Sequence, residues 1–145
     1  MEQAENAEGK APEAHEAPEA LGGRSFPDVH GDFWEAPVFF MAAVGHDKTL
    51  SLSARANVIY SLGVIAGVNE MLLKAYFFGS AEGALDKPEN IKGYTGIMSK
   101  LVALYKAYKD GGRISAADLV EAVEDIELEF FDFAREIMIQ AKHGR

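Results

Sequence analysis

From Phe33 to the C-terminus, apolar residues recur about once per helical turn, and no stretch alternates between apolar and polar residues as a half-buried strand would. The pattern is clearest between residues 116 and 142. There a stripe with spacings of three and four residues comprises Leu119, Val123, Ile126, Phe130, Phe133, Ile137 and Ala141. The sequence therefore predicts an all-α fold, namely an antiparallel bundle of three long helices preceded by one short helix. Short loops between the long helices make consecutive helices antiparallel neighbours, as in an up-down bundle.

Helix boundaries follow from capping residues and breaks. The short helix is expected over 37–44, because proline suits a first helical position and Gly45 then ends the helix. The long helices are expected over about 51–78, 89–109 and 116–142, with Ser51 or Ser53 capping the first and Ser115 capping the last. The aromatic residues around the short helix are interpreted as a lid on the core.

The first twenty residues contain six glutamates, one lysine, two prolines and no Val, Ile, Leu or aromatic residue. Such a segment has too little apolar area to offset the entropy of ordering. We therefore expect residues 1–25 to form a disordered acidic tail and residues 26–145 to form a single helical domain. The glycine-rich stretch 21–32 is interpreted as the boundary between them. Because the tail matches neither a secretory signal nor a mitochondrial presequence, a cytoplasmic protein is expected.

Charge and composition narrow the function. The chain has 145 residues, with 14 Lys and Arg against 23 Asp and Glu, which gives a net charge of −9 and argues against nucleic acid as a partner. It has no cysteine, which excludes thiol chemistry and cysteine-ligated metals. Its four histidines lie outside the long helices, so no helix carries the Glu-x-x-His pair of a di-iron bundle. Phosphate-binding glycine motifs are also missing.

One face of the predicted helix 51–78 is unusual. It carries Ala56, Tyr60, Gly63, Gly67, Glu70 and Lys74, while two other stripes of the same helix are apolar. Gly63 and Gly67 would let another helix approach closely, and their cost of about 1 kcal/mol each relative to alanine calls for compensation by packing. Apolar groups surrounding this helix argue for a central position in the bundle or for burial against another subunit, and we expect the face with Gly63 and Gly67 to mediate self-association. The uncharged run is fourteen residues, shorter than the ~20 that a membrane span needs.

The predicted last helix is strongly acidic on the side opposite its core stripe. Asp118, Glu121, Asp125, Glu129 and Asp132 lie on that face and would suit a basic protein partner. The lysines of the preceding helix are complementary to these acids and favour pairing of the two helices.

An alternative assigns chemistry to carboxylates of the same helix. Glu121, Glu124 and Glu127 have the three-residue spacing that lets side chains share Mg²⁺, and Glu70 could join them across a subunit boundary. This pattern is typical of all-helical nucleotide pyrophosphohydrolases. A charged, solvated helix face explains the acids more simply.

Asn69 lies within an apolar stripe of the helix 51–78. It is interpreted as a buried amide that bonds across the bundle, with a ligand contact between helices as the alternative. Taken together, the sequence favours a non-enzymatic module that binds proteins, its own copy included, with no cofactor. The alternatives are a Mg²⁺-dependent nucleotide hydrolase and, more weakly, a small-molecule binder.

Overall fold

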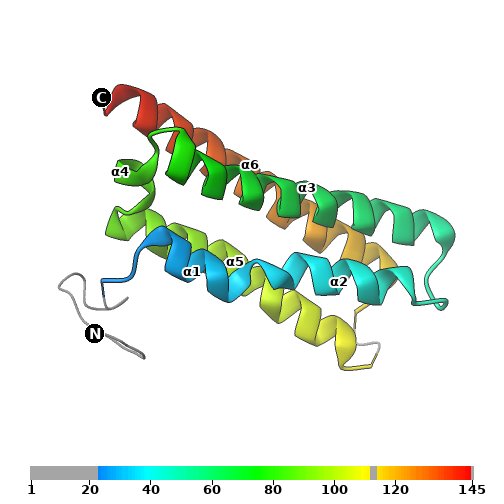
Figure 1. The fold of residues 1–145 in the computed structure, drawn as a ribbon. Helices are drawn as coiled ribbons and strands as arrows, with labels where there is room; N and C mark the ends of the chain where they lie inside the picture. The colour runs from blue at the N-terminus through cyan, green and yellow to red at the C-terminus, as the bar shows by residue number, and fades with distance from the viewer. Residues whose placement is uncertain (1–22, 112–113, 145) are drawn as a thin grey trace.

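The computed structural model describes residues 23–111 and 114–144, and every regular element in these ranges is a helix (Figure 1). The helices are α1 (Phe26–Phe33), α2 (Glu35–Gly45), α3 (Leu52–Phe78), α4 (Glu82–Leu85), α5 (Pro88–Lys109) and α6 (Ala116–His143). The all-α prediction is confirmed for these residues. Positions 1–22, which make up most of the predicted acidic tail, lie outside them.

The N-terminal part differs from the prediction, because two helices occupy the place of one short helix. The backbone N–H of Ser25 donates to the Asp28 carboxylate at 3.4 Å, which caps α1 inside the stretch interpreted as a turn-rich boundary. Phe26 and Val29 bury completely or nearly so against the bundle. Tertiary burial therefore outweighs the glycine at position 31. The helix predicted over 37–44 begins earlier, at Glu35.

Four arms form the bundle, with α1 and α2 following one another as a single broken arm (Figure 1). α2 packs against α3, α5 packs against α6, and α3 packs along α6. Within the first two pairs the helices run in opposite directions, whereas α3 and α6 run the same way (Figure 1). The closed order around the bundle is thus α2, α3, α6, α5.

The connection through α4 sets this order. Residues 79–87 carry the chain from the end of α3 to the start of α5, which lies diagonally across the bundle from α3. Short loops between long helices predict that α3 and α5 are direct neighbours, and this expectation is wrong. The α5–α6 neighbours predicted from charge complementarity are found, with Lys100 Nζ 2.9 Å from Glu129 Oε1.

A buried polar contact joins the diagonal pair through the core. Tyr94 of α5 donates its hydroxyl to Asn69 Oδ1 of α3 at 2.6 Å, and the two residues are 0% and 2% exposed. Asn69 is therefore a buried amide that bonds across the bundle, as its place in the apolar stripe predicts. Phe26 and Phe130 pack on the Tyr94 ring from α1 and α6.

Candidate interaction surface

The outer face of α3 is bare in this chain. All six residues of the face singled out from the sequence are exposed, namely Ala56, Tyr60, Gly63, Gly67, Glu70 and Lys74. Tyr60 is the most exposed large side chain of its middle part, at 71%. α3 buries its two apolar stripes against α2 and α6 and leaves this third face open.

The two glycines of this face have no internal packing that explains them. A Cβ atom at Gly67 would meet nothing within 4 Å, and one at Gly63 would meet only Met41 Sδ at 4.0 Å. Glycine in a helix costs about 1 kcal/mol relative to alanine. Because no part of the described chain approaches these glycines closely, the compensation expected from the sequence is not supplied within this bundle.

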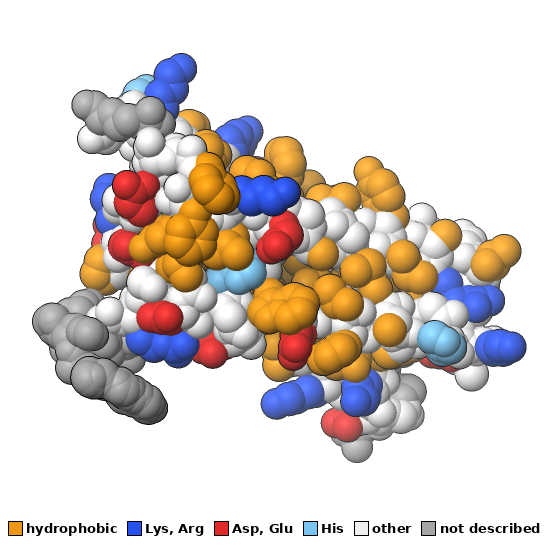
Figure 2. All heavy atoms as spheres, in the orientation of Figure 1, with side chains coloured by type: hydrophobic (Ala, Val, Ile, Leu, Met, Phe, Trp, Pro, Cys, Tyr) orange, Lys and Arg blue, Asp and Glu red, His pale blue; other side chains and the backbone are white. Residues whose placement is uncertain are grey.

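Helix α2 widens the open surface. Met41 lies beside Gly63, and Trp34 and Val38 remain 48% and 41% exposed. We call the set Trp34, Val38, Met41, Tyr60, Gly63 and Gly67 the α2–α3 face. Hydrophobic side chains gather over α1, α2 and α3 on this side of the molecule (Figure 2). The aromatic lid predicted around the first helix is therefore incomplete, since Phe40 is buried whereas Trp34 is not.

The α2–α3 face is uncharged in the middle and charged at both ends. Glu35, Glu70 and Lys74 lie at the end next to α1, and Asp47, Lys48 and Arg55 lie at the other. Arg55 forms no salt bridge within the described residues: its Nε is buried without a partner, and its Nη1 donates only to Gly45 O at 3.4 Å. The end next to α1 has a net negative charge and is called the acidic end, and the other has a net positive charge and is called the basic end. They lie about 20 Å apart along α3, given a rise of about 1.5 Å per residue.

A buried histidine lies beneath the acidic end. His30 of α1 is 5% exposed, and its Nε2 atom lies 3.7 Å from Glu70 Oε1 without a hydrogen-bond partner. Burial lowers the pKa of His30, and the Glu70 carboxylate opposes that effect only in part. The imidazole is therefore neutral at neutral pH and belongs to the contact between α1 and α3.

The acidic face of α6 is solvent-exposed. Asp118, Glu121, Asp125, Glu129 and Asp132 are all exposed along the outer side of the helix. Two of them have basic partners in the same chain: Glu129 pairs with Lys100, and Asp132 pairs with Arg135 at 3.1 Å. Leu128 and Phe131 are 64% and 56% exposed on the same helix, so the acids are interspersed with apolar groups that the sequence pattern did not single out.

The four carboxylates that the alternative hypothesis assigns to Mg²⁺ do not converge on one site. Glu121 and Glu124 are exposed, Glu127 is half-buried, and Glu70 lies beside His30 on another helix. Across residues 23–111 and 114–144, no cluster of three or more Asp, Glu, His or Cys side chains has the geometry to hold a metal ion.

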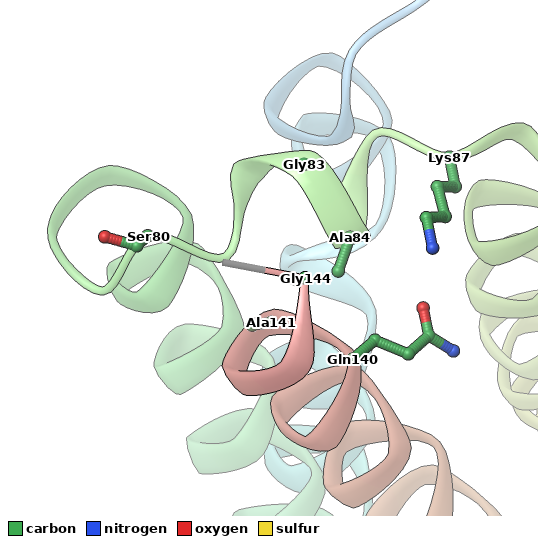
Figure 3. Close-up of a pocket in the computed structure, with 7 residues that line it drawn as sticks. All are labelled: Ser80, Gly83, Ala84, Lys87, Gln140, Ala141 and Gly144. Atoms are coloured by element: carbon green, nitrogen blue, oxygen red, sulfur yellow. The ribbon is translucent and has the colours of Figure 1, made fainter.

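A small pocket lies at the end of the bundle where α4 meets the last turn of α6 (Figure 3). Its volume is about 310 Å³, and its lining comprises Ser80, Gly83, Ala84, Lys87, Gln140, Ala141 and Gly144. Lys87 and Gln140 extend toward each other at one side of it (Figure 3). The Gln140 amide is already engaged, because its Oε1 accepts from Asn90 Nδ2 at 2.8 Å. The lining offers one cation, Lys87, and one hydroxyl, Ser80, and it contains no carboxylate or imidazole.

α3 is the one described helix that is long and apolar enough to cross a membrane by length and composition. Only 33% of its most apolar window is buried inside the bundle. The same composition occurs in core helices of soluble proteins, and the two apolar stripes of α3 contact α2 and α6 here. The prediction that α3 does not span a membrane stays a prediction.

Sequence reasoning located the α3 part of this surface but missed the α2 part. Trp34 lies between α1 and α2 and Val38 lies in α2, and the apolar pattern around them gave no sign that they face outward. The uncharged run from Ala36 to Gly45 is the signal that could have found them, because it matches the uncharged run of α3 beside it. No family model, curated protein or solved structure matches this chain.

Proposed function

We propose that this chain is a non-enzymatic helical module that binds proteins and associates with its own copy through the outer face of α3. Open space over a helical glycine also occurs at Gly96, so the observation that carries the proposal is its combination at Gly63 and Gly67 with the exposed aromatic side chain of Tyr60 on the same face. Two helical glycines with nothing packed on them weaken the isolated bundle, and close approach of a second helix would compensate that cost.

The surroundings of the glycines support the same conclusion. Tyr60 and Trp34 present large aromatic surfaces to solvent, and aromatic residues are enriched at the centres of protein interfaces. Charged groups are confined to the ends of the α2–α3 face, which is the distribution of an apolar centre with a polar rim. The acids of α6 give the module a second surface, suited to a basic partner.

A matched pair of variants tests this proposal. Gly67→Glu places a charge on the α2–α3 face, and Gly96→Glu places the same charge on α5, where a Cβ also meets nothing within 4 Å. Both changes raise helix propensity equally. We expect the unmodified chain to dimerise at micromolar concentrations in sedimentation equilibrium, Gly67→Glu to weaken the dimer at least about tenfold, and Gly96→Glu to leave it unchanged.

The result that would overturn the proposal is equally direct. A chain that sediments as a compact monomer at high micromolar concentration has no self-association to explain. If Gly67→Glu and Gly96→Glu weakened the dimer equally, the dimer contact would not lie on α3. The nucleotide hydrolase alternative remains a prediction from the acidic spacing alone, and no contact in the structure favours it.

A further inference from the structure

We infer that the partner on the α2–α3 face is a second copy bound antiparallel, with α3 crossing α3 near Gly63 and α2 lying over α2. This inference rests on the proposed self-association and adds its geometry. In a twofold dimer the same surface meets itself, so every residue before the axis faces a residue after it in the other copy. Along this face, the residues that precede Gly63 are complementary in charge and size to the residues that follow it, so two antiparallel copies fit each other.

The charges give the first argument. Arg55 lies eight residues before Gly63, and Glu70 lies seven residues after it. An antiparallel crossing at Gly63 therefore brings Arg55 of each copy to Glu70 of the other, twice per dimer. Arg55 forms no salt bridge within the described residues of its own chain and has only a weaker electrostatic interaction with the Asp47 carboxylate, while its buried Nε lacks an acceptor. Glu70 is 61% exposed at its side chain and is available to supply one.

Helix α2 repeats the pattern independently. Met41 is level with Gly63, since its Sδ lies 4.0 Å from the position of a Cβ there. Glu35 lies six residues before Met41, and Lys48 lies seven residues after it. Lys48 belongs to the turn that follows α2, so the same axis brings Glu35 toward the end of the face that carries Lys48 of the other copy. A parallel dimer would instead place Glu70 by Glu70 and Arg55 by Arg55, which is repulsive.

Shape agrees with charge in the middle of the face. Tyr60 lies three residues before Gly63, and Gly67 lies four residues after it. In the antiparallel arrangement the Tyr60 ring, 71% exposed in one copy, rests over the open Gly67 of the other. The most exposed large side chain in the middle of α3 thus meets a position with no side chain, as close packing of two helices requires.

The size of the face suits a moderate dimer. From Arg55 to Lys74 α3 is roughly 30 Å long, and α2 beside it widens the surface to roughly 20 Å. This footprint approaches the ~800 Å² that each partner buries in an interface of standard size. We therefore expect a dissociation constant in the micromolar range rather than an obligate dimer.

Charge reversal tests the pairing. Arg55→Glu and Glu70→Arg should each weaken dimerisation about tenfold, because each replaces two attractive contacts with repulsive ones. The double variant R55E/E70R restores both pairs in an antiparallel dimer and should return to the unmodified affinity. Lys92→Glu, an exposed reversal on α5, is the control, and circular dichroism checks that every variant folds.

Cross-linking tests the orientation, and the chain contains no native cysteine to interfere. Ala56 lies seven residues before Gly63, and Met71 lies eight after it, both exposed on α3. In an antiparallel dimer, each single-cysteine variant stays about 22 Å from its own copy, beyond the ~7 Å Cα–Cα limit of a disulfide. A mixture of Ala56→Cys and Met71→Cys should therefore form only the mixed disulfide.

The outcomes separate this inference from the proposed function. Self-linked A56C and M71C would show a parallel dimer, which overturns the geometry and leaves self-association standing. Dimerisation unaffected by R55E and E70R would also overturn the geometry. A monomer at every concentration would overturn both proposals, and the α2–α3 face would then belong to a different protein.

Discussion

At the scale of single residues, the contact between Tyr94 and Asn69 shows how one polar group can belong to an apolar core. The sequence places Asn69 in a stripe that should be apolar, and the structure supplies a hydroxyl donor 2.6 Å away on the diagonal helix. Burial raises the pKa of Tyr94, which keeps the hydroxyl protonated and able to donate.

Removing that hydroxyl should leave the Asn69 oxygen buried without its donor. We expect Tyr94→Phe to lower the free energy of unfolding by about 1–3 kcal/mol, measured by urea denaturation. Tyr60→Phe makes the same chemical change at a position 71% exposed and should have almost no effect. Similar losses in both variants would mean that the buried contact contributes nothing special.

His30 gives the fold a dependence on pH with a definite sign. Its pKa is lowered by burial, so the unfolded chain takes up a proton at higher pH than the folded chain does. The free energy of unfolding should therefore fall as pH decreases below the usual histidine value of 6.5, until the lowered pKa of the folded state is reached. Well above pH 6.5, the neutral His30 side chain makes its full contribution to the free energy of unfolding.

The measurement compares melting temperatures of the unmodified chain and His30→Gln at about pH 7.5 and about pH 5.5. The unmodified chain should lose more stability on acidification than the variant does. His46→Gln, on the exposed end of α2, should behave as the unmodified chain. An unchanged acid sensitivity in His30→Gln would show that other groups are responsible.

At the scale of helices, the sequence alone predicts the capping residues and the apolar stripes of the long helices. Ser51 accepts from Ala54 N at 3.0 Å, and Ser115 accepts from Asp118 N at 3.1 Å, at the positions that the sequence predicts. These helices are defined by local chemistry, since a side-chain oxygen near an unpaired N–H needs no tertiary information. α1 was missed because the glycines and the proline of 21–32 favoured a turn-rich boundary, and because the burial of Phe26, which stabilises the helix, is not visible in the local sequence.

Replacing the helical glycines that have open space above them with alanine should stabilise the folded chain. Gly67→Ala and Gly96→Ala should each raise the free energy of unfolding by about 1 kcal/mol, measured at concentrations low enough for the monomer. Gly93→Ala should gain less, because a Cβ there would lie 3.4 Å from Phe133 Cε1. If Gly67→Ala gains nothing in the monomer, the space above it is occupied within the chain and the proposed surface is wrong.

At the scale of the whole molecule, Asp86 ties the broken first arm to the rest. Its Oδ1 accepts from the backbone N–H of Phe26 at 2.9 Å, and its Oδ2 accepts from the Tyr76 hydroxyl at 2.8 Å. Burial and this carboxylate together raise the pKa of Tyr76 to about 12, so the hydroxyl remains a donor at neutral pH. One side chain thus connects the start of α1 with the end of α3.

Asp86→Ala should loosen α1 without unfolding the bundle. Hydrogen bonds to a charged group contribute about 1.5–3 kcal/mol each when shielded, and less at an exposed residue such as this one. We expect the amides of α1 to exchange faster with solvent in hydrogen-exchange mass spectrometry, while those of α6 stay protected. Uniform acceleration in both helices would assign Asp86 a global role instead.

The sequence by itself determined the helical class, the three long helices and the exposed face of α3. Each of these depends on neighbours within about one turn: apolar spacing, a capping serine, or glycines that share a face with Tyr60. Because these features depend only on residues close together in the sequence, they can be predicted from the sequence without knowing the tertiary structure.

The tertiary structure alone decided which helices touch. The segment 79–87 could have joined adjacent helices, but it crosses the bundle to the diagonal helix α5 and leaves α6 as the neighbour of α3. Helix order depends on how apolar stripes from distant parts of the chain fill one common core. The spacing of apolar residues within one helix therefore does not show which other helices it will contact.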